Sequence, residues 1–73
     1  MPRKLRELRA DLRRNGWHIA RQRGSHETWK HPLIPGKSAT LAGKDGADAK
    51  PYQEQEIAAA VEAARAVRKG QQP

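Results

Sequence analysis

The residues best suited to take part in a chemical reaction lie in one short stretch, RQRGSHETWKHP, at residues 21–32. It places His26 and His31 near Arg23 and Lys30, around a Gly-Ser pair. Histidine exchanges protons near neutral pH, and Arg and Lys stabilise the negative charge of a phosphate under attack. These types fit cleavage of a phosphodiester, with His26 as base or acid. On residue type and spacing alone, a surface imidazole beside a turn is the favoured alternative.

The spacing of the histidines does not predict a metal site. The run HETWKH begins like the zinc motif H-E-x-x-H, but Lys30 stands in the fifth position and His31 follows one residue late. That motif needs a helix to bring both imidazoles to one face, whereas a strand here would point His26 and His31 to opposite faces. The chain also has no cysteine. We therefore expect no metal and no other cofactor.

Five elements should position these residues in a single domain that spans residues 1–73. In the first element, Leu5, Leu8 and Leu12 recur at helical spacing. The expected elements are a helix over 3–14, strands over 17–22, 26–31 and 38–42, and a helix over 52–69. So small a sheet needs its apolar side covered. The expected fold is therefore α+β in the order α-β-β-β-α, with both helices on one face of a three-stranded antiparallel sheet.

Alternation along the strands predicts which residues share a face. Trp29 should point at the helices, together with Trp17 and Leu41, and the tryptophans then form core rather than base-stacking surface. For Ile19 to lie opposite Trp29, the hairpin loop needs an odd number of residues, which predicts a three-residue turn at 23–25.

The other face of the sheet would then be open and polar. It should carry His26, Thr28 and Lys30, and its rim should carry Gln22, Arg23 and Lys37. His31 shares the Trp29 face and precedes a proline, so we expect it to make a structural hydrogen bond.

The charge of the chain is uneven. The net charge is +7, and residues 1–37 hold ten Lys and Arg against three Asp and Glu, whereas residues 38–73 hold five against five. Such a basic half suggests a polyanionic partner, nucleic acid first. Arg9 and Arg13 are candidate phosphate contacts, and a solvated helix face is the alternative. The absence of helix-turn-helix spacing disfavours a DNA-binding regulator.

No apolar run approaches the length of a signal-peptide core or a membrane span. The sequence therefore predicts a cytoplasmic protein that does not associate with membranes.

The run NGWHIARQRGSHETWKHP (15–32) resembles the HicA family of toxins from bacterial toxin–antitoxin pairs. Four parts of it fall in register with that family: Gly16-Trp17, the run from Arg21 to His26, Trp29, and His31-Pro32. The resemblance implies a fold like that of the double-stranded-RNA-binding domain. It also implies a metal-independent endoribonuclease acting on messenger RNA, with His26 catalytic and with Gly24 and Ser25 shaping the turn. A HicB-like antitoxin would cover the active face.

The resemblance is weaker beyond residue 36. Many relatives end the third strand with a Val-Pro-His type of sequence, whereas this chain has the run from Leu41 to Lys44, followed by an atypical loop, KDGADAKP. A catalytically silent RNA-binding module of the same fold is therefore the alternative function. The predicted site has His26 as catalytic residue and, as substrate-binding residues, Arg23, Gly24, Ser25, Lys30, Lys37, Arg9 and Arg13.

Overall fold

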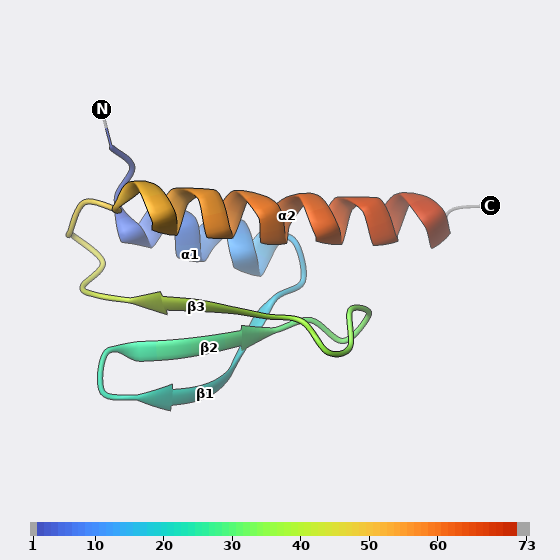
Figure 1. The fold of residues 1–73 in the computed structure, drawn as a ribbon, viewed down its shortest axis with the longest axis horizontal. Coiled ribbons are helices and arrows are strands. Elements are labelled where there is room, and N and C mark those ends of the chain that lie inside the picture. The colour runs from blue at the N-terminus through green and yellow to red at the C-terminus, as the bar shows by residue number, and fades with distance from the viewer. Residues whose placement is uncertain (1, 72–73) are drawn as a thin grey trace.

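A computed structural model describes residues 2–71 of the chain. The elements are α1 (Leu5–Arg14), β1 (His18–Arg23), β2 (His26–Lys30), β3 (Ser38–Ala42) and α2 (Pro51–Gln71). The strands form an antiparallel sheet in the order β1-β2-β3. Both helices lie on one side of it, so the predicted α+β class and element order are confirmed (Figure 1). None of the described helices combines the length and apolar character needed to cross a membrane.

Helix α1 begins two residues later than the sequence predicted, because Lys4 is still extended, with φ −81° and ψ 150°. Lys4 forms an isolated bridge with Asp48 in the loop before α2. The first helical N–H groups donate to that loop: Leu5 N–H to the carbonyl of Ala47 at 2.9 Å, and Arg6 N–H to that of Asp45 at 3.1 Å. The loop therefore caps α1.

The core lies between the helix layer and the sheet. Trp29 is fully buried, and the indole of Trp17 donates from Nε1 to the carbonyl of Ala60 at 3.1 Å. Both tryptophans are therefore core, as predicted. The other large buried residues are Leu5, Leu8, Leu12, Leu41 and Ile57.

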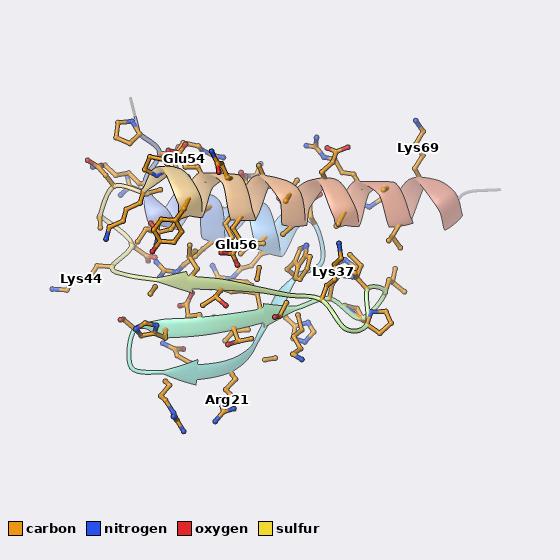
Figure 2. All side chains as sticks on the ribbon, in the orientation of Figure 1. Arg21, Lys37, Lys44, Glu54, Glu56 and Lys69 are labelled. Atoms are coloured by element: carbon orange, nitrogen blue, oxygen red, sulfur yellow. The ribbon has the colours of Figure 1, made fainter. Side chains whose placement is uncertain are left out.

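Helix α2 also covers the outer edge of β3. The backbone N–H of Thr40 donates to Glu56 Oε2 at 2.8 Å, and Gln53 Nε2 donates to the carbonyl of Ala42 at 3.1 Å. Figure 2 shows Glu56 reaching from α2 towards this strand. Two polar backbone groups of the β3 edge, the N–H of Thr40 and the carbonyl of Ala42, are thus satisfied by α2, while β1 remains the outer strand at the opposite edge.

Candidate active site

The hairpin that carries His26 has the predicted pairing of Ile19 with Trp29, but its turn differs from the predicted one. Ile19 lies opposite Trp29 as expected, but Arg23 pairs directly with His26, so only Gly24 and Ser25 form the turn. The predicted three-residue turn is wrong. Gly24 has a φ of +60°, and no described residue other than glycine has a positive φ. This combination fits a type II′ turn, which takes glycine at its first central position.

The turn has an even number of residues, so one extra residue is needed for Ile19 to lie opposite Trp29. A β-bulge in β1 provides this extra residue. The register shifts between Ile19 and Arg21, which leaves Ala20 without a partner on β2. A bulged residue reverses the alternation of all residues that follow it in the strand. The sides of β1 beyond Ala20 are therefore the opposite of those expected.

This reversal decides which β1 side chains accompany His26. Arg21 pairs with Thr28 and Arg23 pairs with His26, so both arginines share the open face. Gln22, expected near the rim of that face, lies opposite buried Glu27 instead, and its Nε2 donates to the carbonyl of Gly24 at 3.2 Å. Figure 2 shows Arg21 pointing away from the helix layer. Sequence reasoning missed Arg21, because only the bulge turns it outwards.

Four side chains on the open face surround one shallow depression of about 340 Å³: Arg21, Arg23, His26 and Thr28. The arginines and His26 are exposed, and Thr28 is half-buried. Two guanidinium groups beside an imidazole combine bidentate phosphate binding with proton transfer. Across the sheet from His26, β3 presents only the methyl group of Ala42.

Lys30 and Lys37 lie away from this depression. Lys30 is on the expected face, but it stands four residues after His26 along β2, which is roughly 13 Å at the rise of a strand. It pairs with Ser38, and Lys37 immediately precedes that residue, so both lysines are at the end of the sheet away from His26. Figure 2 shows Lys37 just before the start of β3. They remain predicted RNA contacts, but they do not border the same depression as His26.

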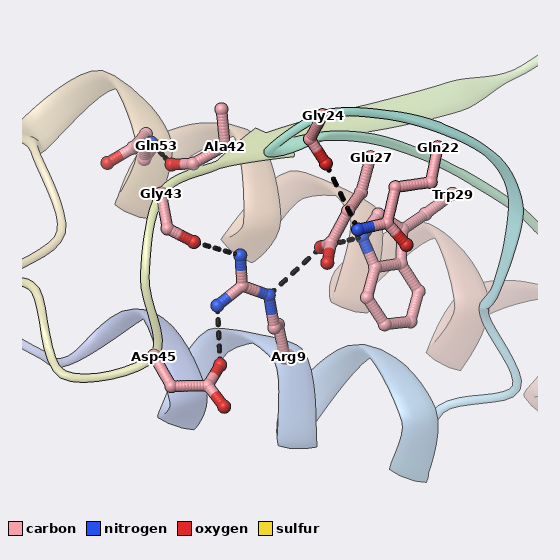
Figure 3. Close-up of polar contacts among 9 residues, drawn as sticks. All are labelled: Arg9, Gln22, Gly24, Glu27, Trp29, Ala42, Gly43, Asp45 and Gln53. Carbon is pink, nitrogen blue, oxygen red and sulfur yellow. Dashed lines mark hydrogen bonds and ion pairs between the residues drawn. The ribbon is translucent and has the colours of Figure 1, made fainter.

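Arg9 is not the solvated phosphate contact that the sequence predicted. Its side chain is 7% exposed, and its Nε donates to Glu27 Oε1 at 2.9 Å. The other guanidinium nitrogens donate to Asp45 Oδ1 and to the carbonyl of Gly43 (Figure 3). Burial lowers the pKa of the guanidinium, but the bonds to the two carboxylates outweigh it and leave the pKa above its usual value. A guanidinium committed to three acceptors cannot serve as a phosphate contact.

Arg13, the other predicted helix contact, is exposed. Its guanidinium carbon lies 5.3 Å from the centroid of the Trp29 ring, within the range of a cation–π contact. Because Trp29 points at the helices, this places Arg13 on the helix side of the sheet, away from His26.

His31 is structural, as predicted, although it lies just beyond the end of β2. Its Nδ1 accepts the N–H of Leu33 at 3.1 Å, and its Nε2 is 2.9 Å from the carbonyl oxygen of Asn15. The acceptor role of Nδ1 requires the proton to be on Nε2. The ring also meets the edge of Trp17 at a centroid distance of 5.4 Å. His31 therefore ties the end of α1 to the segment after β2.

Comparison with models of known protein families places the chain beside a family of toxins. The family model described as HicA toxin of bacterial toxin-antitoxin matches residues 5–63. This range includes α1, the three strands, and hence every residue of the depression around His26. Neither the curated proteins nor the solved structures contain a match to the chain.

Proposed function

Because this chain belongs to the HicA toxin family of bacterial toxin–antitoxin systems, we propose that it is an endoribonuclease that cleaves messenger RNA without a metal ion. As a family member it is a toxin, and an antitoxin is its partner. The observation that carries the proposal is the depression that Arg21 and Arg23, both on β1, line together with His26 on the open face of the sheet.

In the proposed reaction, the ribose 2′-oxygen attacks the adjacent phosphorus, and the bond from phosphorus to the 5′-oxygen of the next nucleotide breaks. His26 takes the proton of the 2′-hydroxyl or gives a proton to the departing 5′-oxygen. Water reaches this exposed site and completes the other proton exchange. The products are a 2′,3′-cyclic phosphate and a free 5′-hydroxyl.

The two arginines supply the electrostatic part of the mechanism. As the 2′-oxygen attacks, negative charge builds on the phosphate oxygens, and fixed positive groups stabilise that charge most strongly in the transition state. Arg21 and Arg23 border the depression with His26. Gly24 and Ser25 form the turn that sets the hairpin end from which Arg23 and His26 project.

The test compares three proteins on one messenger RNA in EDTA: wild type, His26→Ala and His18→Ala. His18 is a matched control, because it is exposed on the same sheet face but pairs with Lys30 at the far end. We expect His26→Ala to lose about 10²- to 10⁴-fold in cleavage rate while it keeps its RNA affinity, and His18→Ala to cleave like wild type. Equal cleavage by His26→Ala would reject the assignment, and loss of wild-type cleavage in EDTA would reject metal independence.

One observation favours a catalytically silent RNA-binding module as the second candidate. Ala42 lies opposite His26, so β3 offers no second proton-transferring group there. The same assay separates the two functions. If wild type and His26→Ala both bind RNA and neither cleaves it, the binding module is correct.

The proposed antitoxin is HicB-like and covers the open face. The exposed cations Arg21 and Arg23 support this, because an acidic partner surface would neutralise them and block His26 at once. Reversing both charges, with Arg21→Glu and Arg23→Glu, should then weaken binding of the antitoxin in titration calorimetry. His26→Ala should leave that binding unchanged.

A further inference from the structure

A second basic depression lies between the two helices. Its volume is about 280 Å³, and it is lined by Asp11, Arg14, Asn15, Val61, Arg65 and Arg68. All of these residues come from α1, the residue after it, and α2. No strand residue lines it, so it belongs to the helix layer and not to the open face that carries His26.

The arginines of this depression form few ion pairs or hydrogen bonds with other residues of the chain. Arg14 donates to Asp11 at 2.9 Å, but Asp11 also accepts from Arg3 at 2.7 Å, so one carboxylate serves two cations. Among the described residues, Arg65 and Arg68 enter no ion pair and no side-chain hydrogen bond. The lining therefore carries three cationic groups against one carboxylate that is already shared.

The end of α1 does not explain Arg14, the arginine that this helix contributes to the depression; Arg65 and Arg68 belong to α2, and Arg68 lies in the last turn of that helix. Basic residues are common at helix ends, where they balance free carbonyl groups. Here other donors already occupy those carbonyls. Asp11 accepts from the side chain of Asn15, Leu12 from the N–H groups of Asn15 and Trp17, and Arg13 from the N–H of Gly16. The carbonyl of Asn15 is bonded to His31.

We propose that this depression binds phosphate groups of the RNA backbone, as an anchor separate from the cleavage site. Guanidinium groups bind phosphate oxygens bidentately, and arginines from two helices around a small hollow suit a tetrahedral anion. The inference rests on the proposed ribonuclease function. A dinucleotide carries a single internucleotide phosphate, so it cannot occupy both depressions at once, whereas a long RNA has phosphates for each.

The test measures binding of poly(U) and of a dinucleotide as a function of salt. The anchor variant neutralises Arg14, Arg65 and Arg68 to Gln. The control variant makes the same change of charge at exposed residues outside the depression, Arg6, Lys44 and Lys50. Circular dichroism and urea unfolding of both variants establish that they fold. Should the anchor variant fail to fold, Arg65→Gln and Arg68→Gln are measured singly.

Each phosphate contact on single-stranded nucleic acid contributes about 0.7 to the slope of log affinity against log salt. The anchor variant should therefore lose about 2 from the slope for poly(U), and each single variant about 0.7. The control variant should lose less, and dinucleotide binding should not change. In the cleavage assay, the KM for long RNA should rise while kcat stays the same.

Two results would overturn the anchor. One is an unchanged poly(U) slope in the anchor variant; the other is normal RNA binding combined with lost binding of the antitoxin, which would assign the arginines to a protein interface. Failure of the ribonuclease proposal looks different, because wild type would then bind poly(U) with the anchor-dependent slope and cleave no RNA.

Discussion

Gly16 stands where the backbone turns from α1 into β1, and His31 packs against its α-carbon. Its φ is +91°, and a side chain there would place a Cβ atom 2.7 Å from His31 Nε2. Glycine is therefore needed twice at this position, for its backbone conformation and for the space it leaves. His31, which is not part of the candidate active site, thus restricts which residue can follow α1 at position 16.

We expect Gly16→Ala to lower the free energy of unfolding by about 2 kcal/mol or more, from left-handed strain plus the displaced His31. Gly24→Ala is the matched control, because Gly24 also has a positive φ, +60°, but nothing lies within 4 Å of its added Cβ. Its cost should be about 1 kcal/mol. Urea unfolding of both variants measures the difference, and equal losses would mean that the His31 contact does not matter.

Arg9 connects α1, β2 and the loop after β3 through its guanidinium group. We expect Arg9→Ala to cost roughly 3–5 kcal/mol in stability, because it leaves the buried carboxylate of Glu27 without a counter-charge. Arg6→Ala, at an exposed position of the same helix, should stay within about 0.5 kcal/mol of wild type. Denaturant unfolding of both variants gives the comparison. If Arg9→Ala instead folds normally and loses only RNA affinity, Arg9 is a phosphate contact after all.

At the scale of elements, the hairpin shows how one bulge determines a site. Ala20 is the residue without a partner, and the residues after it alternate regularly: Arg21 outwards, Gln22 inwards, Arg23 outwards. Removing Ala20 would join Ile19 directly to Arg21 and leave every one of these sides unchanged. The bulge thus allows Ile19 to face the helices while Arg21 and Arg23, later in the same strand, face the open side.

We therefore expect a variant that lacks Ala20 to fold and to keep its RNA cleavage. A variant that lacks Gln22 is the matched control, because its pairing cannot place Ile19 inwards and both arginines outwards without a new bulge. It should lose stability, cleavage or both. Unfolding and cleavage assays on the two deletion variants test this. Loss of cleavage on removal of Ala20 alone would show that the bulge has a role beyond parity.

At the scale of the whole molecule, charge is distributed over both layers. Arg21 and Arg23 lie on the open face, Lys30 and Lys37 at the far end of the sheet, and further arginines between the helices. Only Arg9 among the predicted contacts is committed to internal carboxylates. Most of the net charge of +7 therefore remains available to a polyanion.

We expect the affinity of the wild-type protein for single-stranded RNA to fall steeply between low and physiological salt, because each neutralised phosphate releases counterions. The loss should be similar for unrelated sequences, since phosphate contacts carry no base information. Fluorescence anisotropy on two RNA sequences over a salt series measures both effects. An affinity that is independent of salt would remove the electrostatic basis of RNA binding.

The sequence by itself determined the element order and the inward faces, because these depend on local periodicity. Leucines at helical spacing in α1, and Trp29 and Leu41 on strands, are buried as their alternation requires. The candidate catalytic histidine on the open face followed from the same alternation. The Gly-Ser pair also favours a two-residue hairpin turn. The requirement that Ile19 lie opposite Trp29 instead led to the prediction of a loop with an odd number of residues.

Only the tertiary structure decided whether a bulge or an odd loop places Ile19 opposite Trp29. It also decided which arginines are held in internal ion pairs and which are exposed. A bulge and an odd loop satisfy the same alternation, so the strand sequence does not distinguish them, although they place Arg21 on different faces. Likewise, Arg9 looks like any helix-surface arginine, because the carboxylates that bury it, Glu27 and Asp45, are 18 and 36 residues away in sequence. Ion pairs between residues far apart in the sequence leave no local sequence signal. The burial of the side chains that form them is therefore evident only in the folded structure.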